Sequence, residues 1–370
     1  MRRRELLAAG VAAPLAGWSG AAAAAAPLRL DQVLGSDDGA GFARAEGPRP
    51  FDFPADHGPH PAFRSEWWYL TASLQGDDGA EFGLQFTLFR QALRPVPAEP
   101  GPWDATQIYL GHLAVTDVGA GRHRHWERLV RGHPRLAGVT AAPFRAWIDG
   151  WSLTAAGPGL ERMLLQASGD GVEVGVTFDP VKPLVLQGED GFSRKGPGQA
   201  SYYYTLPRLA AGGSLRLGSR THTVGGTGWL DREWSTSVLS DAQEGWDWFS
   251  LQLDDGVDVM AFRLRRRDGV RDVHDHGMWV AADGTATRLD AADYTLRPLR
   301  RWRDDTGTAW PVAWQVSVSG PAGPVVWRVE AALDDQRMDT LLTYWEGLVR
   351  VFDEAGARIG SGYLELTGYG

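Results

Sequence analysis

Cysteine is absent from this chain of 370 residues. Its absence excludes disulfide bonds, thiolate metal sites, cysteine nucleophiles and the acylated cysteine of a lipoprotein. Lysine is scarce, with Lys182 and Lys195 as the sole examples, and the net charge of -9 comes without any basic block. This acidic balance argues against nucleic acid or anionic lipid as the main partner. With 43% hydrophobic and 22% charged residues, the chain still has ample material for a buried core.

Long apolar runs are missing too, since no segment reaches the roughly 20 residues that a membrane-spanning helix needs. Arg2–Arg4 precede two leucines, and an alanine-rich stretch ends in the run Ala21–Ala26. A basic region, a weakly apolar region and small residues in this order predict a signal peptide over residues 1–26, and the paired arginines indicate the twin-arginine route. The alternative is a membrane anchor, for which alanine and glycine supply little transfer free energy. We therefore expect a periplasmic or secreted protein that is not an integral membrane protein.

Helical periodicity is weak, because no window of a dozen residues shows a persuasive repeat of about 3.6 residues. After a polar segment over 27–50, interpreted as a linker, a period of two dominates. Over 81–90, phenylalanine and leucine alternate with glycine, glutamine and threonine, as a strand with one buried face requires. The pattern predicts an all-β protein of antiparallel strands closed into barrels, which leave no free edge. Asp-Gly pairs typical of hairpin turns separate such stretches at 78–79, 255–256, 268–269 and 283–284.

A faint internal repeat divides the chain. Glu66–Tyr69 begins a strand that leads to an Asp-Asp-Gly turn and a second strand. About half the mature length further on, Glu244–Phe249 leads to the same kind of turn and strand. This spacing predicts two copies of one β unit, with the glycine-rich stretch Gly225–Gly228 at their boundary. The two domains would then occupy residues 51–224 and 225–370.

The motifs of several common enzyme classes do not occur: there is no H-E-x-x-H, G-x-S-x-G, Walker loop or dinucleotide-binding glycine pattern. His123 and His125 are two residues apart, as are His274 and His276, and this spacing on a strand is compatible with a metal ion. Both pairs lie in stretches rich in arginine and aspartate. We expect solvated loops there, with no metal site and no cofactor.

Carboxylates among aromatic residues carry more information. In an extended chain Asp231 and Glu233 share one face, and Asp247 shares a face with apolar residues between two tryptophans. A carboxylate that faces apolar surface has a raised pKa and can hold a proton near neutral pH. Such an acid can protonate an alkene, and indole rings can stabilise the resulting cation. The structural alternative is an acid that accepts an indole N–H or pairs with an arginine.

Seventeen tryptophans make large rings unusually abundant. Together with the neighbouring acids they indicate an apolar, aromatic-lined cavity for a lipophilic ligand. The candidate catalytic residues are Asp231, Glu233 and Asp247. The candidate ligand-binding residues are Glu66, Trp67, Trp68, Tyr69, Tyr203, Trp234, Trp246, Trp248, Tyr344 and Trp345.

Six strings, in order along the chain, resemble those of the secreted AttH proteins, which belong to the carotenoid 1,2-hydratase (CrtC) group of lipocalin-like proteins. The resemblance covers nearly the whole mature chain and implies two tandem lipocalin-like (calycin) antiparallel β-barrels, in agreement with the internal repeat. The strings are 63–69 (FRSEWWY), 186–191 (LQGEDG), 229–234 (WLDREW), 245–249 (GWDWF), 344–347 (YWEG) and 362–369 (GYLELTGY).

The resemblance also implies chemistry. Photosynthetic members of the group add water to a terminal double bond of acyclic carotenoids without a cofactor, by protonation and then water attack on a tertiary cation. Fungal relatives include a hydratase of a plant isoflavonoid and cyclases of polyenes, and AttH proteins are commonly encoded beside an ABC-type exporter. By position in the strings, Asp231 or Asp247 would donate the proton, and Glu233 would be a second acid or the base that orients water. Trp246, Trp248 and Tyr203 would stabilise the cation.

Two hypotheses of different classes remain. In the first, the chain is an exported, cofactor-free, hydratase-like protein that acts on an apolar isoprenoid or polyene, with hydrolase or cyclase chemistry less favoured. In the second, it is a periplasmic lipocalin-like carrier of a lipophilic ligand that works with an ABC-type transporter. Neither hypothesis involves nucleic acid.

Overall fold

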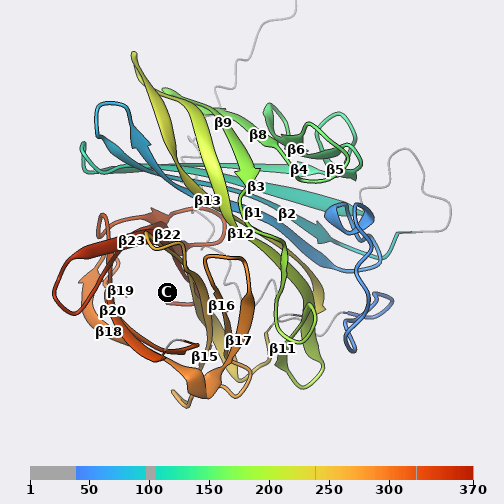
Figure 1. Cartoon of the computed structure of the whole chain (residues 1–370). Coiled ribbons are helices and arrows are strands. Elements are labelled where there is room, and N and C mark those ends of the chain that lie inside the picture. Colours follow the sequence, from blue (N-terminus) through green and yellow to red (C-terminus); the bar gives the residue numbers. More distant parts are fainter. Residues whose placement is uncertain (1–38, 97–105, 238, 322, 370) are drawn as a thin grey trace, which may run out of the picture.

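The computed structural model describes residues 39–96, 106–237, 239–321 and 323–369, which form two large antiparallel sheets (Figure 1). The expected signal peptide and the first part of the expected linker lie outside the described residues. Within them, helix is limited to two single 3-10 turns, Ala55–His57 and Ala291–Asp293. The prediction of an all-β chain is therefore confirmed.

The first sheet contains thirteen strands and is wrapped into a barrel-like shape. Its strands are β1 (Ser65–Gly76), β2 (Glu81–Ala92), β3 (Gln107–Asp117), β4 (Arg122–Arg131), β5 (Ala137–Ala141), β6 (Phe144–Ile148), β7 (Trp151–Ala155), β8 (Met163–Gly169), β9 (Val172–Pro180), β10 (Val185–Leu186), β11 (Phe192–Gly196), β12 (Gln199–Leu217) and β13 (Arg220–Ser237).

The second sheet contains ten strands, and Figure 1 shows it nearly end-on as a ring. Its strands are β14 (Gln243–Leu253), β15 (Asp258–Arg266), β16 (His276–Val280), β17 (Ala286–Asp290), β18 (Tyr294–Arg303), β19 (Ala309–Gly320), β20 (Gly323–Ala331), β21 (Arg337–Met338), β22 (Tyr344–Phe352) and β23 (Arg358–Leu366).

Both sheets have the same circular order. The first runs β4-β3-β2-β1-β13-β12-β9-β8-β7-β6-β5 and the second runs β17-β16-β15-β14-β23-β22-β20-β19-β18. In each sheet, the strand that comes first in the chain pairs with the one that comes last, β1 with β13 and β14 with β23. The two strands at the ends of each order are consecutive in the chain, namely β4 and β5 in the first sheet and β17 and β18 in the second. The hairpins noticed as a sequence repeat, β1–β2 and β14–β15, occupy equivalent positions. The architecture is thus two tandem lipocalin-like barrels of one topology.

The glycine-rich stretch does not separate these sheets. Gly225–Gly228 lies inside β13, which pairs with β1 on one side and β12 on the other. A Cβ at Gly226 would lie 2.1 Å from the carbonyl oxygen of Ser73, so glycine permits a close approach of strands there. The chain leaves the first sheet at Ser237 and enters the second at Gln243. The change of sheet therefore falls C-terminal to the boundary expected at residue 225.

The described part of the expected linker packs against the first sheet. Ala45 is buried, and the carbonyl oxygen of Gly47 accepts a hydrogen bond from the Tyr202 hydroxyl at 3.1 Å. Arg49 pairs with Asp56 at 2.7 Å. Residues 39–50 therefore belong to the first domain.

Each barrel interior is filled by its own hydrophobic core. One face of β1 and β2 contributes Trp68, Leu70, Phe82 and Phe86 to the first core. The second core gathers inward residues of β14, β19 and β22, including Trp314. A third cluster joins residues of both sheets, so the outer faces of the two barrels are packed together. β2 also lies against β22 of the second sheet, which explains why it buries both of its faces, whereas its alternating pattern predicted one.

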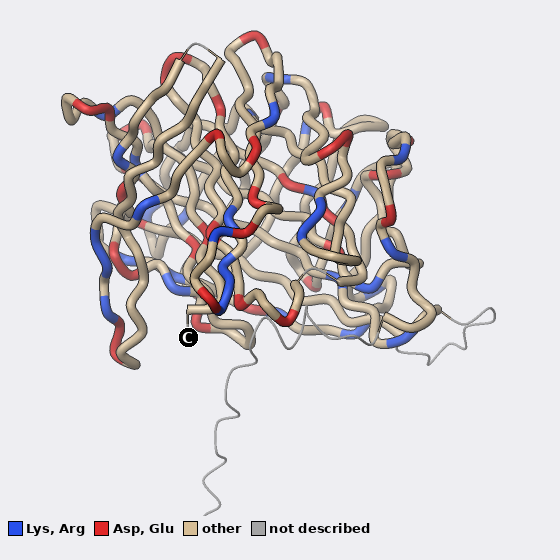
Figure 2. The backbone as a smooth tube through the Cα atoms, turned by 90° about the horizontal axis from the view of Figure 1, so that it is seen from below, with Lys and Arg blue, Asp and Glu red and all other residues tan. Residues whose placement is uncertain are grey.

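Charged residues of both signs are interspersed along the whole chain (Figure 2). Among the described residues, no helix has the length and hydropathy needed to cross a membrane.

Candidate functional site

A pocket lies between the two barrels rather than inside either one. It encloses about 670 Å³, including the part open to solvent. Strands β1, β2, β11, β12 and β13 contribute from the first sheet, and β14, β15, β16, β22 and β23 from the second. The lining residues are Trp67, Tyr69, Phe89, Ser193, Lys195, Tyr203, Asp231, Glu233, Trp246, Trp248, Phe262, His276, Tyr344 and Glu365.

Strand alternation selects these residues. In β1, Trp67 and Tyr69 face the pocket, while Trp68 belongs to the core of the first barrel. In β14, Trp246 and Trp248 face it, while neighbouring side chains turn into the second barrel. Because successive side chains of a strand point to opposite faces, a string of aromatic residues necessarily supplies both a pocket wall and a core.

Of the thirteen candidate residues named from the sequence, eight line this pocket. They are Asp231, Glu233, Trp67, Tyr69, Tyr203, Trp246, Trp248 and Tyr344. The other five lie on the opposite faces of the same strands, away from the pocket. They are Glu66, Trp68, Trp234, Asp247 and Trp345.

Asp247 is fully buried on the interior side of β14. It forms an ion pair with Arg263 and accepts a hydrogen bond from the Tyr369 hydroxyl at 2.7 Å. Arg263 also stacks over the ring of Trp314, a residue of the second core. The surroundings of Asp247 therefore fit the structural alternative, in which the acid pairs with an arginine and has no catalytic role.

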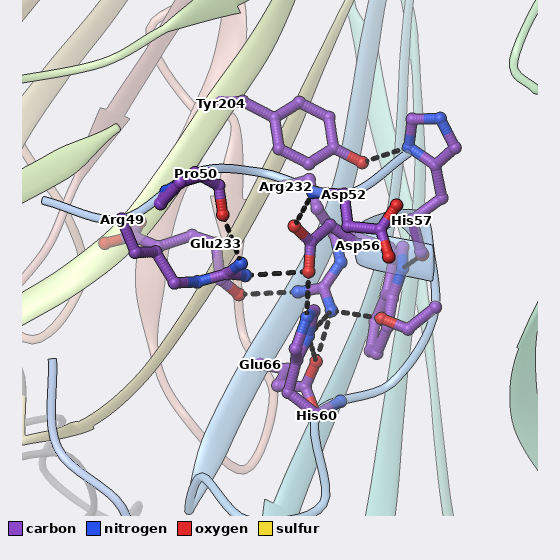
Figure 3. Close-up of polar contacts among 12 residues, drawn as sticks. Arg49, Pro50, Asp52, Asp56, His57, His60, Glu66, Tyr204, Arg232 and Glu233 are labelled. Carbon is purple, nitrogen blue, oxygen red and sulfur yellow. Dashed lines mark hydrogen bonds and ion pairs between the residues drawn. The ribbon is translucent and has the colours of Figure 1, made fainter. Parts of the chain in front are cut away.

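Glu66 belongs to a buried polar cluster at the other face of β1 (Figure 3). Its carboxylate pairs with Arg90 at 2.6 Å and also with Arg232. His60 lies 3.2 Å from the same carboxylate and stacks on Trp234 at 3.9 Å. The two guanidinium groups hold the pKa of Glu66 at about 2 despite its burial. This cluster anchors the segment before β1 to the first sheet.

Asp231 is the most strongly hydrogen-bonded acid of the pocket. Its carboxylate accepts hydrogen bonds from Thr205 at 2.6 Å, Trp229 at 2.8 Å and Tyr203 at 2.8 Å. Burial nevertheless raises the pKa of Asp231 to about 7, and the charge of Glu233 contributes to the rise. Asp231 can therefore be protonated at neutral pH in a pocket walled by aromatic rings.

Glu346 and Glu365 form a second acidic pair, directly opposite each other in β22 and β23. Glu346 accepts a hydrogen bond from the Tyr69 hydroxyl at 2.5 Å, and its second oxygen has no partner among the described residues. Glu365 accepts one from Trp246 at 3.2 Å. Burial raises the pKa of Glu365 to about 8 and that of Glu346 well above its usual range. The pair therefore retains protons at neutral pH.

One cation faces the three acids that line the pocket, Asp231, Glu233 and Glu365. Lys195 forms an ion pair with Glu233, whose Oε1 atom also accepts a hydrogen bond from Ser201 at 2.5 Å. His276 lies 3.3 Å from the Ser193 hydroxyl, and burial lowers its pKa to about 4, so it is neutral. Three lining carboxyls, with Glu346 beside one of them, against one ammonium in a low-dielectric pocket favour stored protons.

His123 and His276 differ from the solvated loops expected for the histidine pairs, while His274 does lie in a turn. His123 lies in β4, 2.9 Å from Thr116, and its pKa is lowered to about 3 by burial. His276 is buried in β16. Each of these two histidines lies where its strand meets the other domain, near Ser193 for His276 and near Gln336 for His123, which the local Arg- and Asp-rich sequence does not reveal. No cluster of three or more potential metal ligands occurs in the part of the chain that the structure describes.

Several pocket residues were not singled out from the sequence. The period of two could have located Glu346, two positions after Tyr344, and Glu365, two positions after Tyr363, once either tyrosine was placed on the pocket face. The other pocket residues lie in segments whose sequence shows no pattern of neighbouring aromatic residues. Only the packing of the two barrels brings them to the pocket. They are Phe89, Ser193, Lys195, Phe262 and His276.

Known proteins resemble this chain over nearly all the described residues. A model of the AttH-like family matches residues 44–369. An AttH protein from Nitrosomonas europaea of known crystal structure is 33% identical, with a TM-score of 0.79 over 89% of this chain and 100% of its own. No curated protein matches the sequence.

Two further solved structures share the fold at lower identity. Kievitone hydratase from Nectria haematococca is 15% identical, with a TM-score of 0.66 over 88% of this chain and 95% of its own. CghA, solved with Sch210972, is 13% identical, with a TM-score of 0.55 over 93% and 98%.

Proposed function

Because this chain belongs to the AttH-like family and gathers protonated acids in an aromatic pocket, we propose that it is a cofactor-free hydratase of an apolar isoprenoid or polyene. The acid groups would add a proton to one carbon of a C=C bond, and water would add to the other. The observation that carries the proposal is the buried Asp231 carboxyl facing the rings between the barrels. The name of the structural neighbour kievitone hydratase supports hydration as the reaction type.

Asp231 is the proposed proton donor. Its proton passes to the alkene carbon that leaves the more substituted cation, and the Asp231 carboxylate is then stabilised by its three hydrogen-bond donors. Tyr69 and Trp229 meet Trp248 edge to face at 5.2 and 6.1 Å, so their rings form a rigid wall. Aromatic faces attract a cation by about 0.5–2 kcal/mol each, which stabilises the intermediate beside the Asp231 carboxylate that proton transfer leaves.

Glu233 is the proposed water-orienting group. Lys195 and Ser201 both bind its Oε1 atom, which leaves the other carboxylate oxygen to accept a hydrogen bond from water. Water then attacks the cation and loses one proton, so the product is heavier by one water. Asp231 regains its proton from solvent, and no redox cofactor or metal is needed for this balance.

A carrier function is the second candidate, and the complete hydrogen bonding of Asp231 favours it. A carboxylate with three donors is well placed for a structural role, and the aromatic pocket would hold a lipophilic molecule without changing it. In that case we propose an exported carrier that delivers its ligand to an ABC-type transporter. The arginines and alanines of residues 1–26 support export under both proposals.

The first test is mass spectrometry of an organic extract of the protein purified from its natural host. Hydration predicts a lipophile together with its counterpart heavier by one water, in a ratio that shifts on incubation. A single ligand that stays unchanged would favour the carrier, and an empty extract would contradict tight binding of any apolar cargo.

Asp231→Asn separates the two candidates directly. Because the amide keeps the shape but cannot donate a proton to carbon, turnover should fall by about 10²–10⁴-fold, while binding of an uncharged phenyl-naphthylamine dye stays unchanged. Dye fluorescence and product formation would be measured side by side. Asp179→Asn, in an exposed pair with Arg162, is the matched control. Full turnover by Asp231→Asn would exclude this acid as the donor.

A further inference from the structure

A hydrogen-bonded chain of three side chains leads from the surface to the pocket. His112, in β3, is completely buried. Its Nε2 atom lies 3.1 Å from Glu127 Oε2, and its Nδ1 atom lies 2.7 Å from the Tyr344 hydroxyl. The Glu127 side chain is 27% exposed at the protein surface, whereas Tyr344 lines the pocket. The chain also crosses from the first sheet to the second.

The chemistry of the partners fixes the direction of the hydrogen bonds. An ionised carboxylate can only accept, so neutral His112 must donate from Nε2 to Glu127. Its Nδ1 atom is then an acceptor, and the Tyr344 hydroxyl donates to it. The backbone N–H of Leu341 also donates to Glu127 Oε2, at 3.0 Å. This is the arrangement in which a histidine, oriented by an acid, can accept a proton from a hydroxyl.

The charges around the chain agree with these protonation states. Burial lowers the pKa of His112 against the raising effect of Glu127, and nearby His125 lowers it further. The pKa of Glu127 is lowered because, against its burial, His112 and Leu341 donate hydrogen bonds to it. At neutral pH the imidazole is thus neutral and the carboxyl ionised.

The Tyr344 hydroxyl also lies close to the acids of the pocket. Its pKa is raised well above the usual value by burial and then by the charges of Glu346, Glu365 and Glu127. The His112 ring stacks against the Tyr344 ring at 5.6 Å and meets Phe89, another lining residue, edge to face at 5.3 Å. Packing therefore holds the imidazole in one orientation between the pocket and the surface acid.

The proposed reaction leaves one proton without an acceptor. When water adds to the cation, one of its protons must leave, but Lys195 and Ser201 already bind one oxygen of Glu233 and the other oxygen is assigned to hold the water. We propose that Tyr344, His112 and Glu127 form a proton relay that accepts this proton. This inference rests on the proposed hydratase function and assigns to Tyr344 a catalytic role and to His112 and Glu127 the roles of positioning and relay residues.

The step balances as follows. The oxygen of water forms a bond to the cationic carbon, and its proton passes to the Tyr344 oxygen as the Tyr344 hydroxyl proton passes to His112 Nδ1. His112 is then a cation beside the Glu127 carboxylate. Its Nε2 proton leaves through Glu127 to solvent, which leaves His112 as the neutral Nδ1–H tautomer and Tyr344 with the hydroxyl proton that it took from water. The resting state returns when Nε2 regains a proton from solvent through Glu127 and the Nδ1 proton passes by way of the Tyr344 hydroxyl to the Asp231 carboxylate, which is thereby reprotonated.

The first experiment reads the histidine tautomer without any substrate. In protein with ¹⁵N-labelled histidine, NMR correlations through the ring assign protonation of each nitrogen, and His112→Gln identifies the signal of His112. The relay predicts the neutral Nε2–H tautomer at neutral pH. The Nδ1–H tautomer would overturn the proposal, because His112 would then donate to Tyr344 and could not take its proton.

The second experiment measures the rate and pH profile of hydration of the lipophile co-purified with the protein. Tyr344→Phe keeps the ring and should lower kcat by about 10²-fold with little change in KM. Glu127→Gln removes the charge that raises the pKa of His112, so the acid limb of the profile should move to lower pH. Glu173→Gln, at an exposed pair with Arg216 away from these residues, is the control and should leave rate and tautomer unchanged.

The outcomes separate this inference from the function on which it rests. If the wild-type protein hydrates the lipophile but Tyr344→Phe and Glu127→Gln match its rate and pH profile, the three residues merely join the two barrels and the relay is wrong. If the wild type does not hydrate it and Asp231→Asn behaves identically, the hydratase proposal itself fails, and the catalytic relay fails with it.

Discussion

At the scale of single residues, the strand face decides what a carboxyl becomes. Asp231 and Glu233 face the pocket, while Arg232 between them points into the first barrel and pairs with Glu66. Asp247 meets Arg263, so a carboxyl one position away from a tryptophan serves stability. Burial without an opposing guanidinium raises the pKa of Asp231 and Glu365, whereas two guanidinium groups lower that of Glu66 despite its burial.

The raised pKa of Asp231 predicts a specific pH dependence of stability. Its pKa rises from 3.8 to about 7 on folding, so the folded state holds the proton more tightly. The stability contributed by this site is therefore greatest below about pH 4 and falls as the pH rises towards about 7.

Asp231→Asn should accordingly gain stability relative to the wild type as the pH rises from about 5 to about 8. The gain over this pH range is about 3 kcal/mol, since the range covers about two pKa units of about 1.4 kcal/mol each. Urea unfolding at both pH values measures it, with Asp179→Asn as the control. A difference between variant and wild type that does not change with pH would contradict the raised pKa.

The buried cluster around Glu66 predicts the opposite pH dependence. Its pKa of about 2 in the folded state lies below the usual 4.5, so its stabilising effect is present above about pH 4.5 and is lost as the pH falls. Glu66→Gln leaves Arg90 and Arg232 without their shared carboxylate and should cost about 3–5 kcal/mol at neutral pH. Denaturant unfolding measures this, and Glu173→Gln, at an exposed pair, should have no detectable effect.

At the scale of the strand, the sequence predicts period and turns well but not which face meets which partner. The alternation over 81–90 and the Asp-Gly turns are observed, with Gly79 and Gly256 at φ of 82° and 91°. For Trp67 and Trp68, however, the local sequence does not tell which side chain faces which way, since both are large aromatic rings. Only the packing of the second barrel against the first makes one a pocket wall and the other a core residue.

Trp67 and Trp68 should therefore respond differently to truncation. Trp68 is 1% exposed and fills the first core, so Trp68→Ala should lower the free energy of unfolding by about 3–5 kcal/mol. Trp67→Ala should cost about 1 kcal/mol of stability but weaken binding of the phenyl-naphthylamine dye about tenfold. Paired unfolding and dye titrations measure both effects. Equal losses of stability would contradict the assignment of the faces.

At the scale of the whole molecule, the sequence predicts two copies of one β unit, and the shared circular order of the sheets confirms it. The place of the pocket could not be predicted, because it depends on how two filled barrels dock through their outer faces. Lysine illustrates this: Lys195 joins the pocket and Lys182 the interface, yet neither stands in an informative local pattern. Contacts between residues of separate sheets produce no periodic pattern in the sequence from which they could be predicted.

The interface also predicts that the two barrels unfold together. Asp258, in β15 of the second sheet, is fully buried and pairs with Lys182 at 2.6 Å and Arg208 at 2.8 Å, both from the first domain. A second contact joins Glu81 of β2 to Arg350 and Arg358 of the second sheet. With an apolar cluster between these contacts, neither barrel can lose its structure without exposing the outer face of the other.

Asp258→Asn tests this coupling. It leaves two cations in the interface without their counter-charge and should lower stability by about 3–5 kcal/mol, although burial itself raises the pKa of this acid and so opposes its charged form. Calorimetry should show one transition for the wild type and one, at lower temperature, for the variant, while Asp268→Asn, at an exposed pair with Arg266, keeps the wild-type midpoint. Two separate transitions in the wild type would mean that the barrels fold independently. The pocket between them would then lack the fixed geometry that acid catalysis requires, because its two walls come from different sheets.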